Sequence, residues 1–377
     1  MCLTTAPPSA YRPATCHQTN RHTGWVHEDR DCQQRYPPCR APWGDHVMMP
    51  ISVIIPAYNA AATLTEALDS VATQNVPLQA VIVVDDASTD GTAKVFAAWS
   101  TSHQDLNPRL IHQAHNQGPA AARNAGIRAA TSDWIAFLDG DDAWLPGKLT
   151  CQMRAATSHP EAALLCGATV PLVEESRDYS KGGRSCGESC LANVSSNLTM
   201  VSPAPGTHIT VLALDTFVTY NPVATSTVMV KRTALEQAGL FDAQFRGPED
   251  YDLWMRIAAM HPCLRLESPL SRYRLTEGSL SMDDRTFLPQ VLGVLHKAFA
   301  RGGALHTYRR QRWRAYADKY ASASWMASNR GAPLAALGLL LRSWIYSPCT
   351  IPKERDHDST LRLKLLLRYL SQLLRIQ

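Results

Sequence analysis

The sequence predicts an α/β fold built on a doubly wound sheet, and two observations indicate this class. Short, continuous apolar runs, typical of buried parallel strands, recur between residues 50 and 140. Segments with apolar residues at helical spacing separate these runs, so strands and helices alternate. In such a fold the crossovers are right-handed, and ligands bind beyond the carboxyl ends of the strands.

The first strand is expected at Ile51–Ile55, an apolar run that Pro56 ends. Apolar residues at helical spacing follow between residues 64 and 71, which predicts a helix. A second buried strand is predicted at Ala80–Val84. The next helix is expected to start near Asp90, whose side chain can cap free backbone N–H groups.

The alternation continues through the next 50 residues. We expect a strand at 109–112, an Ala-rich helix at about 119–130 and a strand at 134–138. Together with the elements before them, these segments give the strand–helix order of a doubly wound sheet.

The second half of the chain is less regular. Residues 170–215 are rich in Ser, Gly, Pro and Asn and are predicted to be a variable loop or insertion. A strand at 226–231 and a helix at 233–238 follow. We therefore expect one domain over residues 49–285, and a helical C-terminal region over 286–377.

Residues 1–48 differ in composition from the rest of the chain. They are rich in Pro, Arg, His and Cys and have neither helical nor strand periodicity, which predicts disorder. Because a clean strand begins just after Met48 and Met49, the biological start could be at either methionine.

Composition limits the function classes and the compartment. The net charge of the 377 residues is +4, with no basic tract interleaved with aromatics, so we expect no nucleic-acid partner. The ten cysteines form no CxxC pair, and reduced thiols are expected. No signal peptide is visible, and the longest apolar stretch, Ala332–Leu341, is too short to span a bilayer. These observations favour a cytoplasmic protein.

Carboxylates follow two of the predicted strands. Asp85 and Asp86 close the strand at 80–84, and Asp139, Asp141 and Asp142 close the strand at 134–138. Because carboxyl ends of parallel strands meet at one edge of the sheet, both clusters should line one crevice. Oxygen ligands suit Mg²⁺ or Mn²⁺, which would also relieve the repulsion among the three neighbouring carboxylates. A solvated acidic turn is the alternative.

A further acidic pair, Glu249 and Asp250, lies at the start of a segment in which Tyr251, Trp254 and Ile257 share one helical face. Capping and interaction with the helix dipole could explain the pair, at about 0.3–1 kcal/mol. A carboxylate outside the metal cluster could also take a proton from an attacking hydroxyl group.

Five blocks of this sequence resemble those of family-2 glycosyltransferases with the GT-A fold. They are highly specific together because they occur in the family's order and spacing, and the likeness covers about residues 50–280. The blocks are Ile54–Asn59 (IIPAYN), Val83–Thr92 (VVDDASTDGT), Ala122–Gly126 (ARNAG), Phe137–Trp144 (FLDGDDAW) and Glu249–Trp254 (EDYDLW).

The resemblance implies a role for each matching position on the donor side. Tyr58 would lie against the nucleotide base, Asp86 would contact the base edge, and Asp85 would support that loop. Asp139 and Asp141 correspond to the family's DxD motif. The residues that would bind the nucleotide sugar are Pro56, Ala57, Tyr58, Asn59, Asp85, Asp86, Arg123, Asp139 and Asp141.

The resemblance also implies a mixed sheet and an inverting reaction. Asp141 and Asp142 would hold Mn²⁺ or Mg²⁺, and Asp250, with Glu249 beside it, would be the general base. The expected acceptor residues are Asn221, Pro222 and Trp254. The donor would be a nucleotide-diphosphate sugar, UDP by default, and the acceptor a glycan or a lipid-linked sugar in cell-envelope synthesis.

The sequence departs from the family pattern after Tyr273-Arg274. Relatives often have a His two residues later, whereas this chain has Thr276. Any role of that His is therefore unfilled here.

The last 18 residues predict a basic amphipathic helix. Its leucine face is Leu363, Leu366, Leu367, Leu370, Leu373 and Leu374. Packing on the preceding helices would explain this face, and so would contact with an anionic membrane surface. Through residues 360–377 the protein could thus bind peripherally to a membrane.

Two other functions fit part of the pattern. A sugar-nucleotide nucleotidyltransferase also uses an α/β fold and acidic metal ligands, but it needs a Gly-rich basic loop, and residues 56–63 have neither Gly nor Lys. A non-catalytic glycan- or nucleotide-binding module would not need both the acidic triplet and Asp250. The sugar, the acceptor and the linkage are not readable from the sequence.

Overall fold

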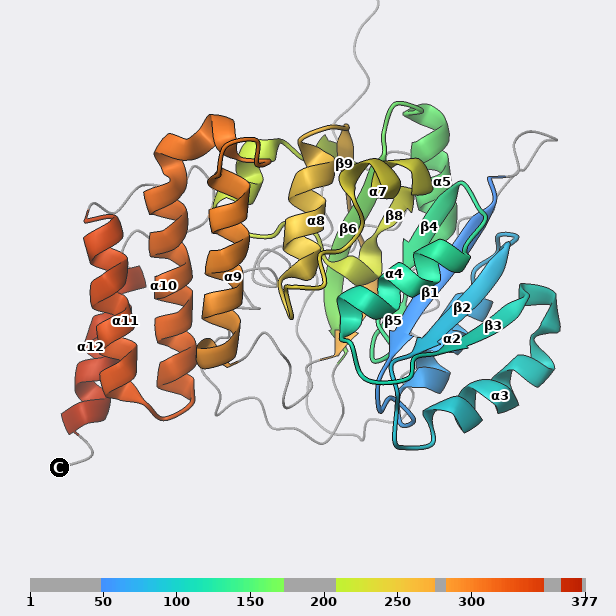
Figure 1. The fold of residues 1–377 in the computed structure, drawn as a ribbon, viewed down its shortest axis with the longest axis horizontal. Helices are drawn as coiled ribbons and strands as arrows, with labels where there is room; N and C mark the ends of the chain where they lie inside the picture. Colours follow the sequence, from blue (N-terminus) through green and yellow to red (C-terminus); the bar gives the residue numbers. More distant parts are fainter. Residues whose placement is uncertain (1–48, 173–207, 275–282, 349–360, 375–377) are drawn as a thin grey trace, which may run out of the picture.

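A mixed sheet forms the centre of the protein in the computed structural model, which describes residues 49–172, 208–274, 283–348 and 361–374 (Figure 1). The predicted N-terminal extension and most of the predicted loop at 170–215 lie outside the described residues. In the described chain the sheet has nine strands: β1 (Ile51–Ala57), β2 (Ala80–Asp85), β3 (Pro108–His112), β4 (Trp134–Phe137), β5 (Ala143–Trp144), β6 (Leu164–Leu172), β7 (Ile209–Val211), β8 (Met229–Lys231) and β9 (Cys263–Arg274).

The strands are hydrogen-bonded in the order β3-β2-β1-β4-β8-β6-β9-β5, and β7 pairs with β9. The first four strands are parallel, with Ile54 opposite both Ile82 on β2 and Phe137 on β4. Strand β8 is antiparallel to both β4 and β6. The sheet is therefore mixed, as the family resemblance implied.

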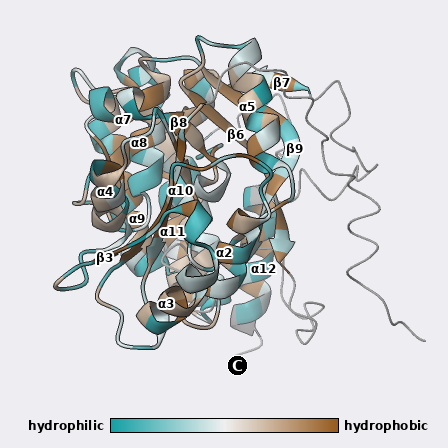
Figure 2. Cartoon of the chain, turned by 90° about the vertical axis from the view of Figure 1, so that its right-hand side faces the viewer, coloured by the Kyte–Doolittle hydropathy of each residue, from teal (hydrophilic) through white to brown (hydrophobic). Residues whose placement is uncertain are grey.

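Helices cover both faces of the sheet, as a doubly wound fold requires. One face packs against α2 (Leu64–Ala72), α3 (Thr92–Ser102) and α5 (Lys148–Ser158). The other face packs against α4 (Pro119–Ala129), α7 (Arg232–Ala238) and α8 (Glu249–Ala258). Successive residues of a strand point to opposite faces of the sheet. In β1, Val53 and Ile55 therefore face the first helical layer, and Ile54 faces the second. Coloured by hydropathy, β6 and β8 form an apolar centre between the helices (Figure 2).

The predicted helix start near Asp90 is confirmed, since α3 begins at Thr92. Asp90 Oδ1 accepts hydrogen bonds from the Thr92 backbone N–H at 2.9 Å and from the Thr92 hydroxyl at 2.5 Å. Asp90 therefore satisfies a backbone donor that the first helical turn leaves free.

The predicted strand at 226–231 is only partly correct. Residues Thr225–Thr227 form a 3₁₀ turn, η4, and the strand β8 starts at Met229. In this turn the Thr227 N–H donates to Ala224 O at 2.9 Å, and the Val228 N–H donates to Thr225 O at 3.0 Å. Local bonds therefore replace the ladder bonds that a longer strand would need, and they leave the hydroxyl groups of Thr225 and Ser226 free to bond to Asp250 and Asp142.

The C-terminal part of the described chain is helical, as predicted: α9 (Asp284–Phe299), the 3₁₀ segment η6 (His306–Gln311), α10 (Arg312–Asn329), α11 (Pro333–Tyr346) and α12 (Leu361–Leu374). Helix α9 joins the main core, where Val291, Val294 and Leu295 cluster with Leu253 and Trp254 of α8. Helices α10, α11 and α12 share a smaller core of their own. Within the described ranges, no helix is both long and apolar enough to cross a bilayer.

Candidate active site

Two acidic clusters meet at the carboxyl edge of the parallel strands, because β1 lies between β2 and β4 in the sheet. Asp85 is the last residue of β2, and Asp139 lies two residues after the end of β4. The Gly140 carbonyl accepts a hydrogen bond from the Thr63 hydroxyl at 2.7 Å, which ties the loop after β4 to the loop after β1. The strand order thus puts both clusters at one edge of the sheet, and their joint role in a binding crevice stays a prediction.

Asp85 and Asp86 hold the loops around the end of β2. The buried Asp86 accepts backbone N–H bonds from Gln117 at 2.8 Å and Gly118 at 2.7 Å. Asp85 accepts the Ser88 N–H at 2.9 Å, and its other oxygen lies 3.1 Å from His112 Nδ1. Asp85 thus supports its loop as the resemblance implied. Asp86 fixes the start of α4, and its contact with a base edge stays a prediction.

The loop after β1 is locked against the loop after β2, and it presents one aromatic ring. Asn59 has a φ of 50°, a left-handed conformation that Asn tolerates better than most residues. Its Oδ1 accepts the Thr89 N–H at 2.8 Å, and its own N–H donates to Ser88 Oγ at 2.9 Å. The Tyr58 side chain between these anchors is 51% exposed, which leaves the ring free to stack on a planar ligand.

The three aspartates after β4 have different surroundings. Asp139 accepts a hydrogen bond from Arg123 Nη2 at 2.6 Å. The buried Asp142 accepts the Ser226 hydroxyl at 2.6 Å and the Arg274 N–H at 2.9 Å. Burial, and then the charges of Asp139 and Asp141, raise the pKa of Asp142 well above its ordinary value. The triplet therefore carries repulsion that a bound cation would relieve.

A divalent metal fits this donor set only together with a substrate. Across the described residues, no group of three or more His, Cys, Asp or Glu side chains is arranged to hold a metal ion. Mg²⁺ and similar ions commonly take one or two carboxylates and complete their shell with water and substrate phosphates. Oxygen ligands from the triplet are compatible with that arrangement.

Asp250 lies in the first turn of α8, next to Glu249, which shares Arg123 with Asp139 of the triplet. Its Oδ2 accepts hydrogen bonds from Asn221 Nδ2 at 3.0 Å and Thr225 Oγ1 at 3.1 Å. Burial, followed by the nearby Glu249 charge, raises the pKa of Asp250 to about 7, although Arg123 opposes the shift. A carboxylate with this pKa can exchange a proton near neutral pH, as a general base must.

Arg123 connects the two sides of the crevice. Its buried guanidinium donates to Asp139 at 2.6 Å and to Glu249 at 2.8 Å. The two carboxylates raise its pKa against the effect of burial. Glu249 also accepts the Gly247 N–H at 2.7 Å, so both of its oxygens are engaged. Glu249 therefore orients the site, and Asp250 remains the carboxylate suited to proton transfer.

The residues predicted for the acceptor lie in different places. Asn221 is half-buried and bonded to Asp250. Pro222 is buried, and its carbonyl accepts a hydrogen bond from Arg265 at 2.9 Å. Trp254 is fully buried, with its ring 5.6 Å from that of Phe241. The Trp254 side chain therefore belongs to the core behind Asp250, which corrects its expected contact with an acceptor.

Sequence reasoning missed three residues that organise the crevice. Thr225 bonds to Asp250, and its neighbour Ser226 bonds to Asp142, so adjacent side chains of η4 reach both sides. Arg274 donates through its backbone to Asp142 and through Nε to the Asp141 carbonyl at 3.0 Å, and it pairs with Glu66. The run of three hydroxyl residues before a buried strand was the available signal. Thr276, the departure from the family pattern, lies outside the described residues.

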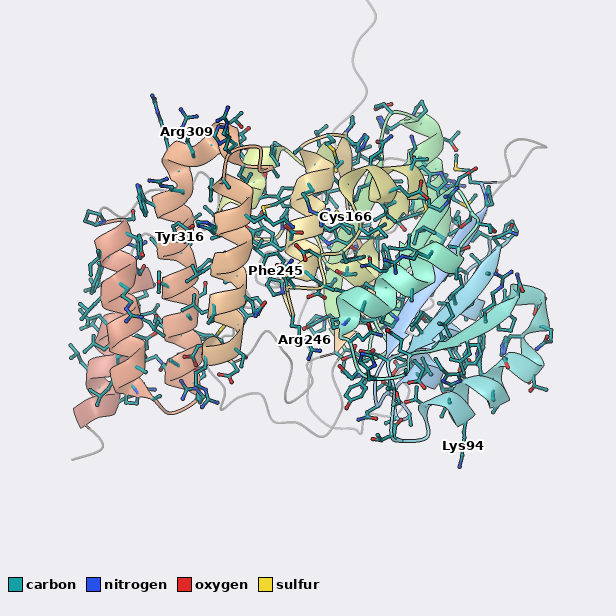
Figure 3. All side chains as sticks on the ribbon, viewed as in Figure 1. Lys94, Cys166, Phe245, Arg246, Arg309 and Tyr316 are labelled. Carbon is teal, nitrogen blue, oxygen red and sulfur yellow. The ribbon has the colours of Figure 1, made fainter. Side chains whose placement is uncertain are left out.

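The exposed Arg246 lies beside the loop that leads into α4. A Cβ atom added at Gly118 would come within 3.5 Å of Arg246 Nε, so the Arg246 side chain passes close to the loop that Asp86 holds (Figure 3). Gly118 also has a φ of +87°, which disfavours any other residue there. A guanidinium at this position can interact with a phosphate group.

Comparison with known proteins identifies related sequences. The family model for glycosyl transferase family 2 matches residues 52–202. The succinoglycan biosynthesis protein ExoO of Rhizobium meliloti is 33% identical over 264 residues, which cover 68% of this chain and 69% of that protein. WfgD of Escherichia coli, a β-1,3-glucosyltransferase, is 25% identical over 65% of this chain and 85% of its own length. Two Rickettsia glycosyltransferases are 30% identical, and the match spans about a third of their length (34%).

Solved structures show the same fold at low sequence identity. A mannosyltransferase from Pyrobaculum calidifontis, in complex with GDP-Man and Mn²⁺, has a TM-score of 0.52 and 20% identity over 91% of this chain and 93% of its own. TarS of S. aureus, in complex with UDP-GlcNAc, has a TM-score of 0.50 and 16% identity over 85% and 92%. The described chain therefore has the GT-A fold.

Proposed function

The chain belongs to glycosyltransferase family 2, and we propose that it transfers a sugar, with inversion, from a nucleotide-diphosphate sugar to an acceptor hydroxyl group. Relatives such as ExoO act in polysaccharide biosynthesis, which supports the same general role here. The observation that carries the proposal is Asp250, a carboxylate with a pKa of about 7 that Thr225 and its neighbour Ser226 link to Asp142 of the acidic triplet.

The donor binds, in this proposal, at the carboxyl ends of β1, β2 and β4. The exposed ring of Tyr58 stacks on the base, and the loops that Asp85 and Asp86 hold form the rest of the nucleotide site. Arg246, near Gly118, adds a positive charge for the diphosphate. We take UDP as the default nucleotide. TarS was solved with UDP-GlcNAc and the Pyrobaculum enzyme with GDP-Man, so relatives of this fold differ in the base.

The acceptor approaches from the side of Asn221 and α8. Asp250 removes the proton of the acceptor hydroxyl while its oxygen attacks the anomeric carbon, and the bond from that carbon to the diphosphate breaks. The proton stays on the Asp250 carboxylate until solvent removes it, and the nucleoside diphosphate departs. A single displacement of this kind inverts the anomeric centre. We propose a glycan or lipid-linked acceptor, by analogy with the diphosphoundecaprenol-linked sugar in the name of WfgD.

The chain's own residues set the charges for this step. Hydrogen bonds from Thr225 and Asn221 stabilise the ionised form of Asp250, and the positive charge of Arg123 also lowers the pKa of Asp250. Asp141 and Asp142 would hold Mn²⁺ or Mg²⁺, which when bound would neutralise the leaving diphosphate as a Lewis acid. The solved complex of the Pyrobaculum relative contains Mn²⁺, which supports a divalent cation.

The test is to incubate the full chain with a panel of nucleotide sugars, Mn²⁺ and candidate acceptors, and to follow nucleoside diphosphate release. Asp250→Asn should reduce transfer by about 10²–10⁴-fold and leave donor binding intact. Asp105→Asn, at an exposed aspartate far from the crevice, is the matched control. Full activity of Asp250→Asn would remove the assigned base, and the absence of transfer with every donor would count against the function.

The same variant carries a stability prediction. The folded pKa of Asp250, about 7, exceeds its ordinary value of 3.8. The stabilisation from protonated Asp250 is thus complete below the unfolded pKa and is lost as pH rises toward about 7. Asp250→Asn should therefore melt no lower than the native protein at neutral pH, which separates loss of the base from loss of the fold.

A further inference from the structure

The outward side of α11 is apolar. Leu334, Leu341 and Ile345 are 73%, 49% and 78% exposed, and their spacing places them along one side of the helix. The opposite side is packed: Leu340 is buried, and the Ser343 hydroxyl donates to Ala317 O of α10 at 2.7 Å. The bundle is thus complete without the outward residues.

Helix α12 has the same arrangement, which differs from the predicted packing. Leu365 and Tyr369 face the bundle, and the Tyr369 hydroxyl lies 3.0 Å from Ser324 Oγ on α10. Three residues of the predicted leucine face, Leu363, Leu367 and Leu370, are instead 54%, 59% and 42% exposed. Leu366 of that face is half-buried against the bundle, and the side chains of Leu373 and Leu374 are not described.

The two apolar stripes belong to one end of the molecule. Figure 1 shows α11 and α12 side by side at the end farthest from α3, beyond α10. Single exposed apolar side chains are ordinary on a protein surface, but six on two neighbouring helices indicate an interaction site. We call this set of residues (Leu334, Leu341, Ile345, Leu363, Leu367 and Leu370) the leucine surface.

The charge around the leucine surface is positive. Helices α11 and α12 contain Arg342, Arg362, Lys364 and Arg368 and neither Asp nor Glu. Long basic side chains can lay their stems along apolar surface while their charged ends stay in water. A partner that covers this surface must therefore combine an apolar interior with negative charge at its rim.

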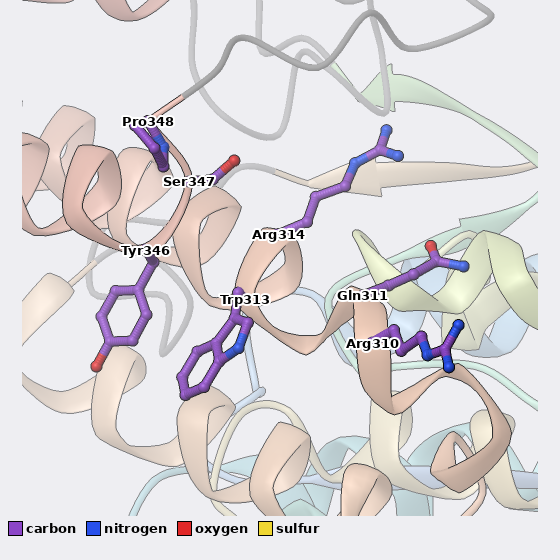
Figure 4. Close-up of a pocket in the computed structure, with 7 residues that line it drawn as sticks. All are labelled: Arg310, Gln311, Trp313, Arg314, Tyr346, Ser347 and Pro348. Atoms are coloured by element: carbon purple, nitrogen blue, oxygen red, sulfur yellow. The ribbon is translucent and has the colours of Figure 1, made fainter.

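A basic and aromatic rim adjoins the Ile345 end of α11. An open hollow of about 340 Å³ there is lined by Trp313, Tyr346, Arg310 and Arg314, among others (Figure 4). The Trp313 ring is 46% exposed and stacks on Tyr346 at 5.7 Å. Aromatic rings and arginines of this kind suit the boundary between lipid headgroups and acyl chains.

We propose that the leucine surface rests on an anionic phospholipid surface, with Trp313 and the neighbouring arginines at the headgroup level. A second copy of the chain is the other candidate, but in a two-fold dimer the basic residues of α11 and α12 would face their own copies and repel. The proposed contact is peripheral, with α11 and α12 lying along the membrane surface. The proposal adds to the proposed function and does not depend on it.

The test is flotation of the full chain with vesicles of phosphatidylcholine alone and of phosphatidylcholine with phosphatidylglycerol. We expect flotation with the anionic vesicles, and weaker binding as salt rises. The double variant Ile345→Asn with Leu367→Asn should weaken binding to the anionic vesicles by about tenfold or more, because two apolar contacts with the lipid are lost. Arg342→Gln with Lys364→Gln should weaken it on the order of tenfold through lost charge.

Val211→Asn is the matched control, since Val211 is 71% exposed on β7, outside the leucine surface. It should float like the native protein. The proposal is overturned if the chain floats with neither vesicle, or if the Ile345 and Leu367 changes leave flotation intact. It is also overturned if analytical ultracentrifugation shows a dimer that these changes dissociate, because a second copy would then cover the surface. Transfer to a water-soluble acceptor should be unchanged throughout.

Discussion

The two sides of the crevice use carboxylates in different ways. On the donor side, Asp85 and Asp86 accept hydrogen bonds from backbone N–H groups and fix loops that need not move. On the acceptor side, Asp250 accepts hydrogen bonds from the side chains of Asn221 and Thr225 as well as from the Tyr251 N–H, and its pKa is raised to about 7. In the proposed reaction, the donor side would therefore keep its shape, whereas the acceptor side would change its protonation state.

The largest effect should come from breaking the link between the sides. In Arg123→Met the buried Glu249 loses its only cationic partner among the described contacts, which costs about 3–5 kcal/mol for a broken buried pair. Thermal or urea unfolding measures this loss. Glu249→Gln combined with Arg123→Met should recover part of it, because no buried charge then remains unpaired. Unchanged stability of the single variant would show that Arg123 does not join the sides.

Replacing Asp86, which holds the loop before α4, should affect donor binding and leave the acceptor side unchanged. Asp86→Ala leaves the N–H groups of Gln117 and Gly118 without their acceptor, at about 1–3 kcal/mol for the buried Gly118 donor and less for Gln117, which water can reach. The KM for the donor should rise, while the pH profile of kcat should stay in place. Asp86→Asn keeps one acceptor oxygen, so its KM for the donor should lie between those of the native protein and Asp86→Ala. A shift of the pH profile in Asp86→Ala would mean that the sides are not separate.

The raised pKa of Asp250 should appear in the pH dependence of sugar transfer. The base acts when ionised, so kcat/KM should fall as pH drops below about 7, the pKa of Asp250. Rates measured between about pH 5 and pH 9 at a fixed metal concentration would show this limb. A rate that stays level down to the ordinary range of an aspartate would contradict the raised pKa.

The smallest change concerns one hydroxyl group. Thr225→Val removes a donor that stabilises ionised Asp250, so the pKa of Asp250 should rise and the acidic limb should move to higher pH. Thr225→Ser keeps the hydroxyl and should leave the limb in place. If both variants lower the rate equally at every pH, Thr225 has only a structural role.

Sequence patterns predicted the elements whose cause is local. The strands β1 to β4 and the helices between them follow from apolar runs and helical spacing, and the start of α3 follows from Asp90. The limits appear where one pattern fits two structures. The run at 226–231 has the pattern of a strand, yet Ser226 belongs to a 3₁₀ turn and bonds to Asp142, while Thr225 just before it bonds to Asp250.

By itself, the sequence determined the fold class, the family and the convergence of the acidic residues, because strand order brings the ends of parallel strands to one edge. Only the tertiary structure decided which neighbours each group meets. It placed Trp254 in the core, joined Asp139 to Glu249 through Arg123, and left the leucine surface of α11 and α12 outside the bundle. A helical period shows that a face is apolar, but packing alone decides whether that face turns inward.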